Sequence, residues 1–212
     1  MKTNKILLIL AGILITTGVL GCKRKSTEPH TESQAKPQTI HEAAKLGDEV
    51  AVKEFLANNV PVDTKDKFGM TSLHYAAAYG QQEVVRLLID NGAAIEAENK
   101  GGGTPLGEAV MGLGGNFEIA ELLIAKGANV NAKNFNGLSI LHKAVMNGEP
   151  AIVRLLLVNG ANANTTDKLG ETPLERAISL AEEQFRPGSK MAEKKERFRE
   201  CAKVLREYQE KK

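Results

Sequence analysis

From residue 38 onward, apolar side chains recur at the three- and four-residue spacing of helices rather than in the alternation typical of strands. One clear example is Val-Val-Arg-Leu-Leu-Ile at residues 84–89, which is followed by a turn that contains Gly92. Close counterparts begin at Ile119 and Ile152, and each is also followed by a glycine. The pattern predicts short helices that are each closed by a turn.

A second set of glycines shows that these helices belong to a repeat. Gly69, Gly102, Gly137 and Gly170 are 33, 35 and 33 residues apart, and a related run follows each of them. A unit of this length cannot bury an apolar face alone, so the units are expected to stack and the terminal ones to act as caps. The related runs span residues 71–77, 104–110, 139–145 and 172–178, and residues 40–44 open the series.

These runs resemble the Thr-Pro-Leu-His-x-Ala signature of the ankyrin repeat, whose period is about 33 residues. The resemblance covers residues 38–212 as five repeats. It implies an all-α repeat solenoid of stacked helix-turn-helix repeats with short β-hairpin fingers. The short segments 94–97, 130–133 and 163–166 are expected to be extended and to lead into the fingers.

The fifth repeat departs from the pattern. Ala177 and Val204 are 27 residues apart, whereas the equivalent Ala76 and Leu87 are 11 apart, so 16 residues are inserted. We expect a first helix that extends to about Gln184 and a long capping helix over residues 190–209. The third repeat is expected to contain a widened turn at residues 111–116.

The N-terminus resembles a bacterial lipoprotein signal peptide. Lys2 and Lys5 precede an apolar run over residues 6–20, which is shorter than the about 20 residues that a membrane span needs. The sequence Val-Leu-Gly before Cys22 is similar to a lipobox, which implies cleavage after residue 21 and acylation of Cys22. An uncleaved N-terminal anchor is the alternative. The residue after the cysteine is Lys23 rather than aspartate. This favours attachment of the lipoprotein to the outer membrane, where it would face the periplasm.

Residues 22–37 are predicted to be a disordered tether, because after Cys22 they contain no large apolar residue that a core would need. The tether begins with three basic residues at 23–25. They either contact anionic lipid headgroups or are simply solvated. The folded part would then be held at a distance from the membrane surface by a flexible segment.

The charge balance argues against a nucleic-acid partner. The chain has 28 Lys and Arg residues against 26 Asp and Glu residues. Removal of Lys2 and Lys5 with the signal peptide leaves 26 against 26. Nucleic-acid binding needs a concentrated excess of cations, which this sequence lacks.

Catalytic or cofactor chemistry is not indicated. His41, His74 and His142 recur with the repeat, far from the one-turn spacing of paired metal ligands, and the resemblance implies that they bond to neighbouring backbone. The glycine-rich loops lack a following Lys-Ser/Thr, and no nucleophile elbow is present. Cys201 falls at an apolar position of the repeat and is expected to be a buried, inert thiol. We therefore expect no enzyme, no cofactor, no metal and no small-molecule substrate.

The resemblance implies a protein partner that docks on the fingers and the concave helix face. Apolar and aromatic residues at those positions are candidates, because such side chains are common interface anchors. Some of them would instead pack against neighbouring repeats. The candidate partner-binding residues are Tyr75, Tyr79, Phe68, Phe135, Leu169, Met111, Leu113 and Met146.

Three functions are compatible with a lipid-anchored interaction protein in the bacterial envelope. The first is inhibition of, or immunity to, a secreted toxin such as a lipase, which the anchor would meet at the membrane surface. The second is stress protection in association with catalase, and the third is a structural lipoprotein that binds peptidoglycan. All three are analogies from architecture.

Overall fold

The computed structural model describes residues 36–112, 115–185 and 188–211. The predicted signal peptide, Cys22, residues 23–35 of the tether and Leu113 lie outside the described residues. Within the described part, the helices are α1 (Ile40–Leu46), α2 (Glu49–Ala57), α3 (Ser72–Ala78), α4 (Gln82–Asp90), α5 (Pro105–Met111), α6 (Phe117–Ala125), α7 (Ile140–Asn147), α8 (Pro150–Val158), α9 (Pro173–Glu182), α10 (Lys190–Glu193) and α11 (Lys195–Glu210).

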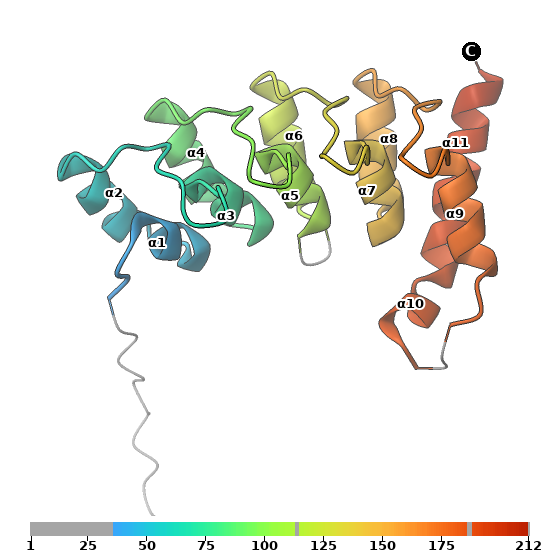
Figure 1. Ribbon diagram of the computed structural model, residues 1–212, viewed down its shortest axis with the longest axis horizontal. Helices are drawn as coiled ribbons and strands as arrows, with labels where there is room; N and C mark the ends of the chain where they lie inside the picture. Colours follow the sequence, from blue (N-terminus) through green and yellow to red (C-terminus); the bar gives the residue numbers. More distant parts are fainter. Residues whose placement is uncertain (1–35, 113–114, 186–187, 212) are drawn as a thin grey trace, which may run out of the picture. The chain divides into compact units, whose positions relative to one another are not determined.

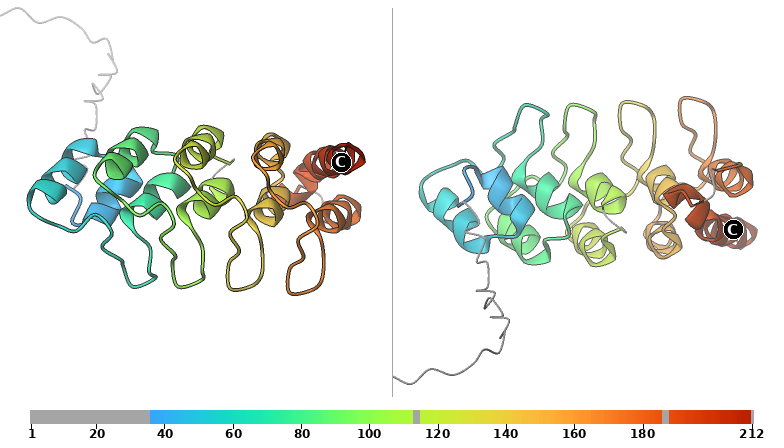
Figure 2. Two further views of the ribbon diagram at one scale, coloured as in Figure 1. Left: turned by 90° about the horizontal axis from the view of Figure 1, so that it is seen from above. Right: turned by 90° about the horizontal axis from the view of Figure 1, so that it is seen from below.

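The helices stack as pairs along one direction, as Figure 1 shows. The first helices α1, α3, α5, α7 and α9 form one layer, and each contacts the next. The second helices α2, α4, α6, α8 and α11 form the other layer, and long loops project from the stack between successive pairs (Figure 2). This arrangement confirms the predicted all-α repeat solenoid.

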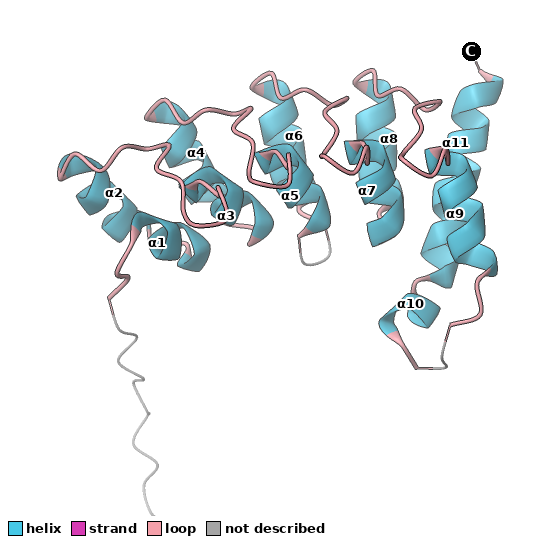
Figure 3. Cartoon of the chain, in the orientation of Figure 1, coloured by secondary structure: helices cyan, strands magenta, loops and turns pink. Residues whose placement is uncertain are grey.

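The projecting loops differ from the hairpins that were expected. Figure 3 draws them as loops, and the described residues contain no strand, only an isolated bridge between Lys133 and Ser139. Each loop is instead closed at its tip by turn hydrogen bonds, such as Asp66 N to Met70 O at 3.0 Å. We call these four tips, residues 66–70, 99–103, 134–138 and 167–171, the fingers.

The residue that follows each finger caps the first helix of the next pair. Thr104 Oγ1 accepts from Gly107 N at 3.3 Å, and Ser139 Oγ accepts from His142 N at 3.3 Å. Such caps satisfy backbone amides that have no partner inside the helix. Proline at the first position of α5 and α9 loses no helical hydrogen bond.

The core runs between the two helix layers without interruption. First helices contribute an alanine at one shared position, where Ala76, Ala109, Ala144 and Ala177 are each 0% exposed, and this small side chain lets the helices approach closely. Second helices contribute a leucine, as at Leu123, that is also 0% exposed. Stacking of apolar faces therefore holds the repeats together.

Polar side chains join successive repeats at the carboxyl ends of the first helices. There the last carbonyl groups of a helix have no partner within it, so a donor from the following repeat stabilises them. These bonds are Gln81 Nε2 to Lys45 O at 3.0 Å, Asn116 Nδ2 to Ala77 O at 2.7 Å, Asn147 Nδ2 to Val110 O at 2.9 Å and Lys194 Nζ to Asn147 O at 2.7 Å.

The C-terminal cap is broken where one continuous helix was expected. Instead of a helix over 190–209, α10 ends at Glu193, Lys194 caps it, and α11 begins at Lys195. The Lys194 side chain donates to both oxygens of Asn147, which ties this break to the fourth repeat. Arg197 pairs with the buried Glu149 carboxylate, and Phe198 is 0% exposed. The first helix of this repeat ends at Glu182, two residues before its expected end.

Candidate interaction surface

Each finger is built by its first residue, which is Asp66, Asn99, Asn134 or Asp167. The side-chain oxygen Oδ1 of Asp66 accepts from Phe68 N at 2.8 Å and from Met70 N at 2.9 Å. Asn134 Oδ1 accepts from Asn136 N and Leu138 N in the same way, both at 3.0 Å. One oxygen thus closes the whole turn, and the two residues at the tip take no part through their side chains.

Neighbouring fingers bond to one another through the backbone. Phe135 N donates to Gly101 O at 2.9 Å, and Lys100 N donates to Phe68 O at 3.0 Å. The Phe135 ring lies so close to the preceding finger that a Cβ atom on Gly102 would be 2.6 Å from its Cδ1. Gly102 also has a φ of 73°, so this position needs glycine both for conformation and for space. The first three fingers are therefore joined to one another in an ordered row.

Three of the predicted partner-binding residues lie on this row. Phe68, Phe135 and Leu169 are 58%, 62% and 77% exposed. The ammonium of Lys67 lies 5.0 Å from the centre of the Phe68 ring. The finger tips thus present large apolar side chains to solvent next to lysine.

A second group of predicted residues lies at the other end of the first helices. Tyr79 caps the carboxyl end of α3, Met111 is the last residue of α5, and Met146 is near the end of α7. Tyr79 and Met111 are 46% and 45% exposed, whereas Met146 is partly buried. A seven-residue helix is about 10 Å long, so this group is separate from the finger tips. The predicted residues therefore form two groups rather than one patch.

Tyr75 differs from the other candidates because it is bound within the protein. Its hydroxyl donates to Asp66 Oδ2 at 2.8 Å, and its ring meets His41 edge-on at 5.9 Å. Burial, together with the bond to Asp66, raises the pKa of Tyr75 to about 12. The ring also lines a pocket of about 390 Å³ between α1 and the first finger. Tyr75 thus has a structural role, and its contact with a partner stays a prediction.

The histidines have the joining role that the resemblance implied. Thr71 N donates to Nδ1 of His74, so Nε2 carries the proton and donates to Gly103 O at 3.0 Å, in the following finger. His142 Nε2 donates to Glu171 O at 2.9 Å in the same way. Burial lowers the pKa of both histidines below the ordinary 6.5, because a protonated ring would lose its hydration.

The third repeat has no such histidine, since Gly107 takes its place. Above Gly107 lies the side chain of Lys143, a buried residue of α7 that the sequence interpretation did not single out. The signal in the sequence was a lysine nine residues after a finger that begins with asparagine, where the other such finger, at Asn99, has Glu108.

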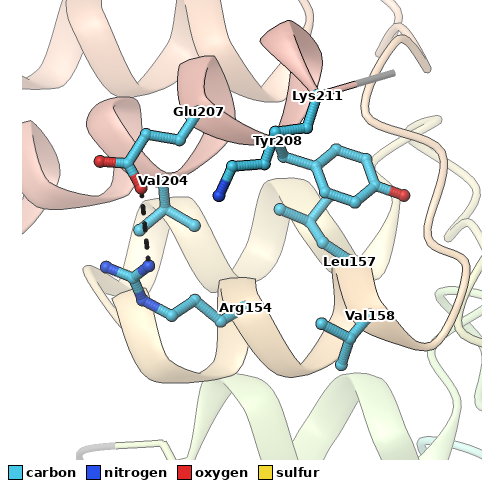
Figure 4. A pocket seen from close by; sticks show the side chains of 7 residues that line it. All are labelled: Arg154, Leu157, Val158, Val204, Glu207, Tyr208 and Lys211. Atoms are coloured by element: carbon cyan, nitrogen blue, oxygen red, sulfur yellow. Dashed lines mark ion pairs between the residues drawn. The ribbon is translucent and has the colours of Figure 1, made fainter.

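A separate groove lies on the layer of second helices, between α8 and α11 (Figure 4). It has a volume of about 280 Å³, and Leu157, Val158 and Val204 give it apolar walls. Arg154 and Glu207 form an ion pair of 3.9 Å at one edge. The groove contains none of the predicted site residues.

The described residues contain no cluster of three or more His, Cys, Asp or Glu side chains able to hold a metal ion. Cys201 is 0% exposed, and burial raises the pKa of its thiol to about 12, so the thiol stays protonated near neutral pH. In the same part of the chain, no helix combines the length and the apolar character that a membrane crossing requires.

A stack of helix pairs with a row of projecting fingers defines a repeat protein. Such a protein offers an exposed surface for binding rather than a closed pocket. The family model described as "Ankyrin repeats (3 copies)" matches residues 40–134 and 114–185. Together these matches cover more than half of the chain, which therefore belongs to the ankyrin-repeat family. No curated protein matches the sequence. Ankyrin repeats are protein-interaction modules, and the chain belongs to this class of protein.

Proposed function

We propose that this chain is a protein-interaction module that is anchored by lipid at Cys22 in the bacterial cell envelope. The observation that supports the binding role is the row of exposed apolar finger tips at Phe68, Phe135 and Leu169. Turn closure uses other atoms, so all three side chains can contact a partner, although one side of the Phe135 ring also covers Gly102. The anchor rests on the lipobox-like sequence before Cys22 alone.

Within this function, we propose that the module inhibits a secreted toxin such as a lipase. A lipid anchor would hold the inhibitor at the membrane surface, where a lipase acts. Association with catalase and binding of peptidoglycan are the competing roles. The full chain is used to capture its partner from detergent-solubilised envelope, and the bound species is then identified. Its identity as a toxin, as catalase or as peptidoglycan distinguishes the three roles.

Replacement of Cys22 tests the anchor. Cys22→Ser is expected to leave an unprocessed precursor that incorporates no labelled fatty acid, whereas the unsubstituted protein is labelled and fractionates with membranes. Fatty-acid labelling at the unsubstituted level would contradict the lipid anchor, although it would leave the interaction module itself untouched.

Substitution of the finger tips tests the docking surface. A Phe68→Ser, Phe135→Ser, Leu169→Ser variant is expected to keep its fold, as judged by circular dichroism, and to lose the captured partner. Val50→Ser, Val158→Ser is the matched control, because these residues are 67% and 77% exposed on the second-helix layer. Equal capture by the finger variant and by the control would show that the partner binds elsewhere.

A further inference from the structure

In three of the four fingers, the first residue bonds to the side chain nine residues later, on the helix that follows. Asp66 Oδ2 accepts from Tyr75 at 2.8 Å, and Asp167 Oδ2 accepts from Arg176 at 2.7 Å. In the second finger the roles are reversed, because Asn99 Nδ2 donates to Glu108 Oε1 at 3.2 Å. Each of these three fingers therefore pairs one donor with one acceptor.

The third finger breaks this rule. Asn134 uses its Oδ1 to close the turn, which leaves only the donor Nδ2 to face the helix. The residue nine positions later is Lys143, whose ammonium is also only a donor. Two donors thus stand at the two register positions that hold a donor–acceptor pair in the other fingers. Among the described residues, the Lys143 side chain makes no hydrogen bond and no ion pair.

Lys143 is nevertheless only 9% exposed. Its side chain turns back over α5, where Gly107 leaves space: a Cβ atom at Gly107 would lie 2.7 Å from Lys143 Nζ. Thr104 Oγ1 is 3.6 Å from that Cβ position. Because the third repeat has Gly107 in place of the histidine, a notch is left over α5, and the Lys143 side chain lies in it.

The charge on Lys143 is poorly compensated in this notch. Burial lowers the pKa of its ammonium, and the Glu108 carboxylate, which forms no ion pair with it, opposes that shift. Among the described residues, Glu108 is the charged side chain that raises the pKa of Lys143, and its Oε1 already accepts from Asn99. A buried charge without a close counter-charge is costly, and a binding anion would recover that cost.

We propose that Lys143 and Asn134 form a subsite that binds a carboxylate side chain of the protein partner. This inference rests on the proposed function, because it places the subsite at the base of the third finger, within the proposed docking surface. A carboxylate supplies the acceptor that both side chains lack. An aspartate or glutamate fits better than a phosphate dianion, because the subsite has a single cation and Glu108 lies nearby.

Direct observation of the ammonium tests the subsite without a partner. The full chain, labelled with ¹⁵N-lysine and solubilised in a nonionic detergent, is titrated with sodium acetate against sodium chloride at constant ionic strength. The Lys143 Nζ resonance, assigned from its loss in Lys143→Met, is expected to shift with acetate in a saturable way. The exposed Lys53 serves as the reference for non-specific effects.

Asn134→Asp is the matched variant, because it rebuilds the acceptor that Asp66 and Asp167 provide in their fingers. It is expected to raise the pKa of Lys143 and to abolish the acetate response. Two results would overturn the subsite. One is an acetate-induced shift of the Lys143 Nζ resonance no larger than that of Lys53, and the other is an unchanged acetate response in Asn134→Asp. Neither result bears on the finger-tip test, so the failures of the two proposals are distinguishable.

The captured partner provides the final measurement. Both Lys143→Met and Asn134→Asp are expected to weaken its affinity by about tenfold or more, because each removes the attraction for a partner carboxylate. Unchanged affinity in both variants would overturn the assignment, even if acetate binds.

Discussion

Leu123→Ala is the most direct test of the repeat register. Leu123 is 0% exposed in α6, and its equivalents Leu88 and Leu156 are equally buried in the helices on either side. Truncation removes a completely buried side chain and leaves a cavity between three repeats, which costs about 2–5 kcal/mol. A domain of this kind is stable by about 5–15 kcal/mol, so the loss is large. Urea unfolding followed by far-ultraviolet circular dichroism measures it.

The adjacent Leu122 provides a matched control, since it is the same residue type in the same helix but is only partly buried. Leu122→Ala is expected to cost clearly less than Leu123→Ala. The central position also matters, because inner repeats have two stacking neighbours whereas terminal repeats have one. If Leu123→Ala were neutral, or cheaper than Leu122→Ala, the assignment of the buried helix face would be wrong.

Two further predictions concern the fingers and the histidines. Gly102→Ala is expected to destabilise the protein more than Gly170→Ala in thermal unfolding; both glycines have positive φ, but only the Cβ at Gly102 would meet Phe135. Smaller destabilisation by Gly102→Ala would refute the finger contact. The folded-state pKa values of His74 and His142 are lowered, so the unfolded chain binds more protons in acid than the folded chain does. The contribution of these histidines to the unfolding free energy is therefore present above pH 6.5 and is lost as the pH falls below it. A His74→Gln, His142→Gln variant should show a flatter pH profile of unfolding free energy, and an unchanged profile would assign the pH dependence to other groups.

The fold was predictable because its signals are repeated along the chain. The capping Thr and Ser residues, the small alanine and the buried leucine each recur at one register position, so a single misread copy does not change the prediction. Burial of Cys201 followed from the same register. Regular spacing thus predicts which face of each helix is buried.

Features that depend on contacts between repeats were not predictable. At the break between α10 and α11, the Lys194 side chain bonds to Asn147, 47 residues earlier, and no local pattern reveals that contact. The expected extended segments were also wrong, because residues 94–97, 130–133 and 163–166 each contain a turn. Single side chains close the finger turns, which therefore need no strand ladder. Tyr75 looked like a free interface residue, yet its hydroxyl is bound to Asp66.

The construction of the fingers also has a consequence for how the binding surface can diversify. Because the first residue and the glycine of each finger hold the turn, the two positions between them carry little of the folding information. Lys67 with Phe68, and Lys168 with Leu169, are therefore open to replacement by many residue types at small cost. Phe135 is the exception, since its ring covers Gly102. Randomised libraries at these tips would be expected to retain the scaffold while sampling new specificities, and lineages of this protein would be free to exchange partners by the same route.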